Sequence, residues 1–129
     1  MNKLFCTIRK WDYNGMMRYN PSTKNLNKQI HTLHRKLKKK DEVYTTYTIE
    51  RDETLNQYHI HTLFQYNNKE NLYKQLQKYI GGDIVISKGM NGSFDKCFGK
   101  YGTLWLEEVK DEKQIYRYIN KYGVSKTLV

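Results

Sequence analysis

Cysteine is scarce in this chain of 129 residues, because only Cys6 and Cys97 are present and they form no Cys-x-x-C motif. Two cysteines are too few for a disulfide framework, and we expect both to be small buried side chains. A long apolar run is also missing, which argues against a membrane-spanning helix. The first residues lack the apolar segment of a secretory signal peptide, so we expect an intracellular protein.

Alanine is absent, and acidic residues are outnumbered: 23 lysines and arginines face 13 aspartates and glutamates, for a net charge of +10. Twelve tyrosines accompany this charge. Basic and aromatic side chains together suit a groove that binds phosphates and stacks bases, although a merely soluble basic surface has the same composition. Repeats, low-complexity tracts and linkers are also missing, so we expect one domain over 1–129.

The pattern of apolar residues predicts an α+β fold. The first helix starts near Thr23 and has the stripe Leu26, Ile30, Leu33 and Leu37, and its other face is strongly basic. A second helix over 68–80 ends at Gly81, a plausible C-cap, and a loop is expected between 87 and 103. The full expectation is strands over 3–8, 43–50, 57–66, 83–87 and 103–109, with helices at 23–40, 68–80 and 111–122. This order predicts a central antiparallel sheet flanked by helices.

Two histidines on one expected strand are the most informative feature. His59 and His61 are separated by one residue, so both project from the same face of the strand. An isolated pair of this kind is more often two surface histidines than a metal site. If 43–50 and 57–66 form a hairpin in which Glu50 opposes His59, a carboxylate joins the two imidazoles. Such a set suits Mg²⁺, Mn²⁺ or Zn²⁺.

Other side chains compete for these roles. Asp52 and Glu53 are alternative carboxylate ligands, but they lie in the expected turn. His31 and His34 are three residues apart on the first helix, beside its apolar stripe. We interpret them as packing or surface residues.

The last expected helix carries a tyrosine and a lysine on one side. Tyr118 and Lys121 are neighbours at the i, i+3 spacing, whereas Tyr116 falls on the other flank. A phenol with a pKa of about 10 is a poor nucleophile at neutral pH, but a nearby cation stabilises its phenolate. The alternative is that Tyr118 is simply one more tyrosine at the edge of the core.

Three motifs together resemble those of the HUH endonuclease superfamily, in particular the replication initiators (Rep proteins) of small circular single-stranded DNA viruses. Phe5-Cys6-Thr7-Ile8 is similar to their first motif, and His59-Ile60-His61 to the histidine–hydrophobic–histidine motif that names the group. Tyr118-Ile119-Asn120-Lys121 is similar to the third motif, Y-x-x-K. The resemblance covers nearly the whole chain, with the motifs in the family's order and spacing.

This resemblance implies a sequence-specific, metal-dependent single-stranded DNA endonuclease that starts rolling-circle replication. A divalent ion, Mn²⁺ or Mg²⁺, is held by His59, His61 and Glu50. Tyr118 attacks the scissile phosphate and forms a 5′-phosphotyrosine linkage, and Lys121 orients the site or balances charge. The family fold is a ferredoxin-like sheet with flanking helices.

The resemblance also implies partners and a cellular location. The DNA partner is origin DNA, single-stranded or in a hairpin, contacted by Phe5, Thr7, Arg9 and Lys10. The protein partner is a fused or host helicase, and no membrane is involved. The chain acts in the host nucleus if it comes from a eukaryotic virus, and in the cytoplasm if it comes from a prokaryotic element. Two alternatives remain open: a single-tyrosine HUH transposase, in which glutamine is usual near the tyrosine, and a non-catalytic single-strand-binding module.

Overall fold

The computed structural model describes residues 1–54, 56–89, 92–109 and 125–129, together with Asp111, Lys113, Tyr116, Arg117 and Ile119. Its helices are α1 (Thr23–Lys38) and α2 (Lys69–Ile80). Its strands are β1 (Asn2–Lys10), β2 (Asp12–Asn14), β3 (Met17–Tyr19), β4 (Tyr44–Asp52), β5 (Gln57–Tyr66), β6 (Ile84–Gly89), β7 (Gly92–Gly99), β8 (Gly102–Glu108) and β9 (Lys126–Leu128). The fold is α+β, as the sequence predicted.

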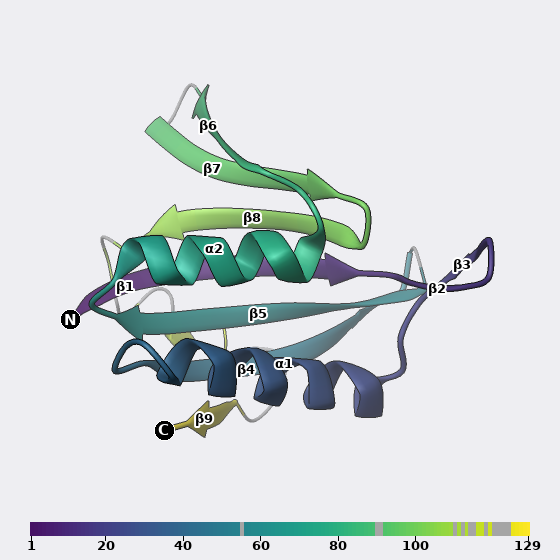
Figure 1. The fold of residues 1–129 in the computed structure, drawn as a ribbon, viewed down its shortest axis with the longest axis horizontal. Helices are drawn as coiled ribbons and strands as arrows, with labels where there is room; N and C mark the ends of the chain where they lie inside the picture. Colours follow the sequence, from purple (N-terminus) through teal and green to yellow (C-terminus); the bar gives the residue numbers. More distant parts are fainter. Residues whose placement is uncertain are drawn as a thin grey trace.

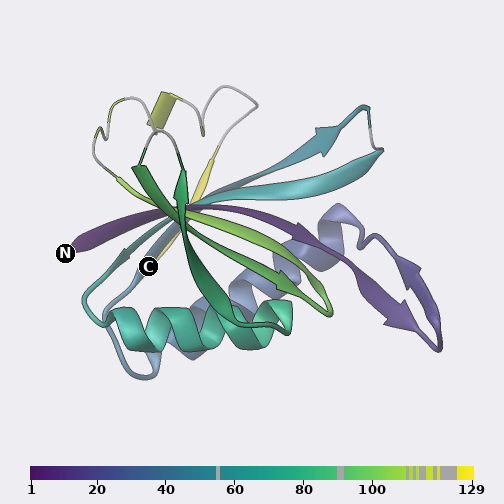
Figure 2. The same cartoon turned by 90° about the horizontal axis from the view of Figure 1, so that it is seen from above.

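One large sheet organises the molecule. Its seven strands lie in the order β6-β7-β8-β1-β5-β4-β9, and every neighbouring pair is antiparallel. The inner strands β8-β1-β5-β4 are connected through α1 and α2, and both helices lie on the same side of the sheet (Figure 1; Figure 2). This is the split βαβ arrangement of a ferredoxin-like sheet, extended at both edges. Strands β2 and β3 form a separate hairpin.

The main core lies between the sheet and the two helices. Alternation along β1 directs Leu4, Cys6 and Ile8 toward the helices, where all three are buried. The expected helical stripe also reaches this layer, because Leu26, Ile30, Leu33 and Leu37 of α1 are buried there. Fully burying each of these aliphatic side chains contributes roughly 1.5–3 kcal/mol. These large apolar side chains therefore hold both helices on one face of the sheet, and polar side chains of the same strands lie on the other face.

The helix ends follow local capping rules. The Ser22 side chain accepts a hydrogen bond from the Asn25 amide (3.2 Å), and Asn68 does the same for Asn71 (3.0 Å). Gly81 ends α2 with φ of 79°, in the left-handed region where glycine avoids a steric penalty. The expected starts of both helices and the C-cap at Gly81 are thereby confirmed.

Four strands were not expected. Residues 92–99 form β7 where a loop was predicted, and the short strands β2, β3 and β9 were also missed. Glycines at both ends of β7 and a weak apolar alternation conceal it in the sequence, but it pairs with a strand on each side. The short strands, of three residues each, depend on their partners rather than on local propensity.

The expected helix over 111–122 is described only in part. Lys113, Tyr116, Arg117 and Ile119 have helical backbone. Ile119 is buried against Phe5 and Leu63, on the sheet face that α1 and α2 leave uncovered. Within the described ranges, no helix is long and apolar enough to cross a membrane.

Candidate metal centre

The hairpin of β4 and β5 builds the site. Glu50 lies opposite His59, and Thr48 lies opposite His61, which is the predicted register. Directly opposed residues of an antiparallel pair share a face, so the carboxylate and both imidazoles stand on the same side of the sheet. That side is the one opposite α1 and α2.

The three side chains converge on one point. The Glu50 Oε2 atom lies 2.9 Å from His59 Nε2 and 2.8 Å from His61 Nε2, and the two Nε2 atoms are 3.0 Å apart. His61 is only 2% exposed and His59 only 8%, whereas Glu50 is half-buried. Among the described residues, this is the one group of three metal-ligating side chains whose donor atoms lie within 4.8 Å of one another.

The surroundings of His61 fix its ring. Thr7, its partner across β1 and β5, places Oγ1 3.4 Å from His61 Nδ1. The ring of Phe5 stacks on the imidazole with centroids 6.0 Å apart and planes 4° from parallel. Because Nδ1 is engaged by the threonine, Nε2 faces the centre of the cluster, as in metal sites whose ligating histidines are oriented by an outer hydrogen bond.

His59 is held differently. Its Nδ1 atom is buried and has no hydrogen-bond partner among the described residues. Its ring meets that of His61 edge-on, with centroids 4.7 Å apart. His59 therefore lacks the outer anchor that Thr7 gives to His61.

The electrostatics favour a cation. Burial lowers the pKa of His61, the hydrogen bond that its ring donates to Glu50 opposes this shift, and the charge of His59 adds to it. A lowered pKa keeps the imidazole neutral at neutral pH, which is the state that ligates metals. Two imidazole nitrogens and one carboxylate oxygen facing a common point form a suitable donor set for a divalent ion with open positions.

The alternative ligands lie elsewhere. Asp52 is 3.4 Å from Arg9 Nη2, and it also accepts a hydrogen bond from the Thr54 amide (3.1 Å). Glu53 lies in the turn between the two strands and is exposed. His34 is buried with Nδ1 2.8 Å from Thr45 Oγ1, and His31 is 3.4 Å from the Tyr47 hydroxyl. Of the carboxylates near the hairpin, only Glu50 joins the two histidines.

The residues predicted to contact DNA divide between the two faces of the sheet. Phe5, Thr7 and Arg9 lie on the face of the metal centre, with Thr7 opposite His61 and Arg9 opposite His59. Lys10 follows directly on β1, so its side chain points to the other face, where it is 9% exposed and lies near α1 and α2. Lys10 therefore lies away from the candidate metal centre, and its contact with DNA stays a prediction.

The predicted nucleophile pair, Tyr118 and Lys121, lies outside the described residues. Tyr116, the alternative tyrosine, is described and packs against the cluster of Phe5, Leu63 and Ile119. Since Phe5 also stacks on His61, this cluster adjoins the metal centre.

Exposed aromatic residues on the same face were missed in the sequence. Trp105 on β8 lies opposite Thr7 and is 41% exposed, and Phe98 on β7 is 62% exposed. Their rings are 6.1 Å apart, and the Lys96 ammonium lies 5.5 Å from the centre of the Phe98 ring. Strand alternation signals Trp105, because Leu104 and Leu106 on either side of it point into the core.

The chemical capacity of this face is therefore a divalent-ion donor set beside exposed rings and basic side chains. Such rings stack nucleobases, and such charges bind phosphates. Comparisons of the chain with protein-family models, with curated proteins and with solved structures found no match.

Proposed function

We propose that this chain is a metal-dependent single-stranded DNA endonuclease of the HUH type, which nicks and rejoins DNA at a replication origin. The observation that carries the proposal is the convergence of Glu50, His59 and His61 on the open face of the sheet. A module that only binds single strands has no need for two buried imidazoles and a carboxylate around one point. Exposed Trp105 and Phe98 on the same face suit a single-stranded substrate.

The metal ligands are His59 Nε2, His61 Nε2 and Glu50 Oε2, and the ion is Mn²⁺ or Mg²⁺. When bound, such an ion polarises the scissile phosphate as a Lewis acid. Thr7 orients His61, and Phe5 covers one side of its ring. Arg9, half-buried opposite His59, is positioned to balance phosphate charge at the edge of the cluster.

Tyr118 is the proposed nucleophile on sequence grounds. Its hydroxyl gives up a proton as the oxygen forms a bond to phosphorus, the bond from phosphorus to the 3′-oxygen of the preceding nucleotide breaks, and that 3′-oxygen takes up a proton. The products are a 5′-phosphotyrosine and a free 3′-hydroxyl, and the reverse reaction rejoins the strand. Lys121, three residues further along the sequence, supplies positive charge. The burial of Ile119 against Phe5 and Leu63 supports this assignment, because Ile119 follows Tyr118 in the sequence.

The test is covalent capture. A single-stranded library with a randomised centre is incubated with the protein and Mn²⁺, and adducts that survive denaturation are isolated and sequenced. We expect adducts from wild type, none after chelation, and none from His59→Ala or His61→Ala. Tyr118→Phe should abolish the adduct while leaving DNA binding intact, because only the attacking oxygen is lost. His31→Ala is the matched histidine control and should behave as wild type.

Two results would contradict parts of the proposal. If Tyr118→Phe still forms adducts and Tyr116→Phe does not, the nucleophile is Tyr116. If wild type forms no adduct but retains single strands, the chain is the non-catalytic binding module that the exposed rings also favour. A single-tyrosine transposase of the same superfamily is less well supported, because the position after Asn120 is Lys121 rather than glutamine.

A further inference from the structure

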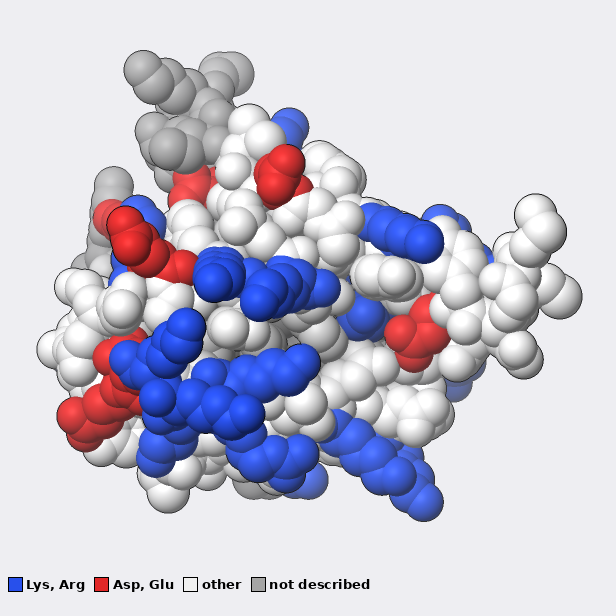
Figure 3. Space-filling model, viewed as in Figure 1, with Lys and Arg blue, Asp and Glu red and all other residues white. Residues whose placement is uncertain are grey.

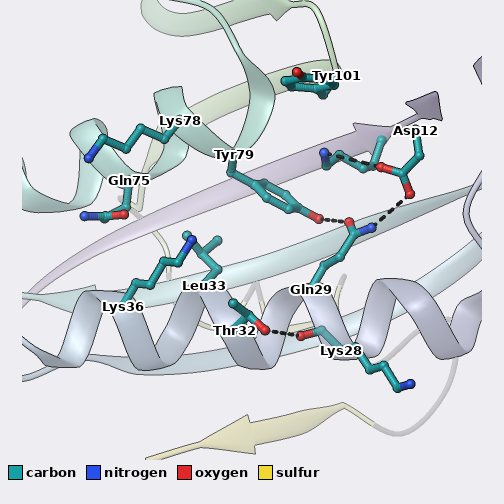
Figure 4. Close-up of a pocket in the computed structure, with 11 residues that line it drawn as sticks. Asp12, Lys28, Gln29, Thr32, Leu33, Lys36, Gln75, Lys78, Tyr79 and Tyr101 are labelled. Carbon is teal, nitrogen blue, oxygen red and sulfur yellow. Dashed lines mark hydrogen bonds and ion pairs between the residues drawn. The ribbon is translucent and has the colours of Figure 1, made fainter. Parts of the chain in front are cut away.

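The face of the molecule away from the metal centre has a basic hollow between α1 and α2. It has a volume of about 440 Å³, and its lining includes four lysines and a single carboxylate, that of Asp12. Figure 4 shows Lys36 from α1 and Lys78 from α2 on two sides of it, while Lys28 turns outward. This hollow concentrates positive charge on the side of the sheet that the proposed nuclease does not use.

Fixed contacts build the floor of the hollow. Lys10 reaches it from β1, 3.7 Å from Asp12 Oδ1, and its ammonium lies 4.6 Å from the centre of the Tyr79 ring and 5.0 Å from that of Tyr101. The Tyr79 hydroxyl donates to Gln29 Oε1 (2.7 Å), and Gln29 Nε2 donates to Asp12 Oδ2 (3.2 Å). The hollow is therefore preformed, with one lysine already held in it.

Among the described residues, the positive charge of the three lysines at the rim of the hollow is not balanced by ion pairs with acidic side chains. Lys28, Lys36 and Lys78 are exposed, and no ion pair engages them in the part of the chain that the structure describes. Helix α1 contains no aspartate or glutamate along its 16 residues. Lys24 and Lys28 are spaced i, i+4, and Lys24 also lies in the first turn, where the helix dipole disfavours a cation. A bound polyanion relieves both penalties.

The basic surface continues across α1. A second hollow of about 730 Å³ on the other flank of this helix is lined by Lys24, Lys28, Arg35 and, from β9, Lys126. Lys28 lines both hollows, so they adjoin. Figure 3 shows lysines and arginines gathered over α1 and α2 on this face. Helix α1 is about 24 Å long, and duplex DNA carries one charge per about 1.7 Å of its axis, so the surface spans several phosphates.

Among the described residues of α1 and α2, this basic surface has no exposed tyrosine, phenylalanine or tryptophan ring. Its exposed imidazole, that of His31, lies 3.4 Å from the Tyr47 hydroxyl and meets the Tyr47 ring edge-on. Tyr79 is half-buried, and its hydroxyl is bonded to Gln29. Binding of single strands relies on stacking as well as charge, whereas binding of a duplex backbone relies on charge alone. A surface that offers positive charge but no exposed Tyr, Phe or Trp ring therefore favours duplex DNA over a single strand.

We propose that the α1–α2 face, centred on Lys28, Lys36 and Lys78, binds the phosphate backbone of double-stranded DNA, separately from the metal-centre face. The contacts are to phosphates and carry no base specificity. The proposal does not depend on the nuclease activity, because it rests on the charge and shape of the opposite face. It gives the chain two nucleic-acid surfaces, one for each side of the sheet.

The experiment compares two variants with the same charge. In the first, Lys28, Lys36 and Lys78 are all replaced by Gln. In the control, Arg18, Lys113 and Arg117, exposed residues outside α1 and α2, are replaced by Gln. Binding of a blunt 16-base-pair duplex is measured over a salt series, without divalent ions. We expect the log–log salt slope of the first variant to fall by roughly 2 to 3 units relative to wild type, as for about three lost phosphate contacts. The control should keep the wild-type slope.

A competition measurement completes the test. Saturating single-stranded oligonucleotide should leave most of the duplex bound, since the two bind on opposite faces. Equal slopes for the two variants would overturn the proposal, as would one-for-one displacement of duplex by single strand. Binding to vesicles of anionic phospholipid without binding to the duplex would also overturn it. Loss of nicking in wild type bears only on the proposed nuclease, because duplex binding is measured without metal.

Discussion

On one face of the sheet, Glu50, His59 and His61 converge in a largely buried cluster beside the exposed ring of Trp105. On the other face, two helices cover the sheet and present lysines around a hollow, and the described residues of these helices include no exposed Tyr, Phe or Trp ring. Strand β1 contributes to both, with Thr7 and Arg9 on the first face and Lys10 on the second. A single alternating strand thus divides its polar side chains between two kinds of chemistry. The difference teaches that net charge alone does not identify the face of the candidate metal centre, because much of the positive charge lies on the other face.

The largest effect that separates the faces is expected from Thr7→Val. The change removes the hydroxyl 3.4 Å from His61 Nδ1 but keeps the shape of the side chain. Loss of an outer hydrogen bond to a ligating histidine typically lowers metal affinity about 10–100-fold, and we expect that range for Mn²⁺ measured by calorimetry. Duplex binding, which belongs to the opposite face, should not change.

Thr7→Ser is the matched control, because it retains the hydroxyl and should restore most of the metal affinity. If the valine and serine variants bind Mn²⁺ equally, the hydroxyl does not orient His61. A weakened duplex affinity in Thr7→Val would instead show that the two faces are coupled.

An intermediate effect is expected from Trp105→Ala. Base–aromatic stacking contributes about 1–3 kcal/mol per base, so single-strand affinity should fall by that amount in a fluorescence anisotropy titration. Duplex affinity should remain at the wild-type value. Tyr13→Ala, which removes an exposed ring from the β2–β3 hairpin, is the control and should alter neither. An equal loss for single strand and duplex would remove the distinction between a stacking face and a charge-only face.

The predictable parts of the fold are those in which local pattern and long-range pairing agree. The sequence offered the pairing of Glu50 with His59 only as a condition, and the structure has that pairing. Alternation restricts the register to steps of two residues, because a slip of one residue would turn every side chain to the wrong face. The alternation of side chains along β1 also places Thr7 and Arg9 on one face of the sheet and Lys10 on the other, although the family resemblance grouped all three as DNA contacts. Strand β7 escaped notice because its pairing on both sides, rather than its own sequence, makes it a strand.

Tertiary contacts set the remainder. The α1–α2 hollow brings together Lys10 from β1, Tyr79 from α2 and Tyr101 from the turn before β8, and no spacing in the sequence relates these residues. The basic stripe of α1 was apparent in the sequence, but a stripe alone is also what a solvated helix face shows. The hollow beside this stripe, and its position on the sheet face opposite the candidate metal centre, could be seen only in the folded structure.

The smallest expected effect concerns His34, a buried residue of α1. Burial lowers the pKa of its imidazole below the ordinary value of 6.5, a hydrogen bond of the ring to the Val129 backbone opposes this shift, and the charges of Lys38 and His31 lower the pKa further. The unfolded chain therefore binds this proton more readily than the folded chain. The free energy of unfolding should decline as the pH falls below 6.5 and level off once the folded pKa is passed, by at most about 1.4 kcal/mol per pH unit for one proton.

Urea unfolding of wild type and His34→Asn, at several pH values and with a chelator present, measures this contribution. Asparagine keeps a polar group close to the position of Nδ1, which lies 2.8 Å from Thr45 Oγ1, but it does not titrate. The chelator prevents metal binding at His59 and His61 from adding its own pH dependence. We expect the variant to lose stability less steeply between pH 6.5 and the acid plateau. Identical slopes would mean that acid destabilises the protein elsewhere, with the histidines of the metal centre as the next group to test. That result would move the pH sensitivity from the helix-covered face to the metal-centre face.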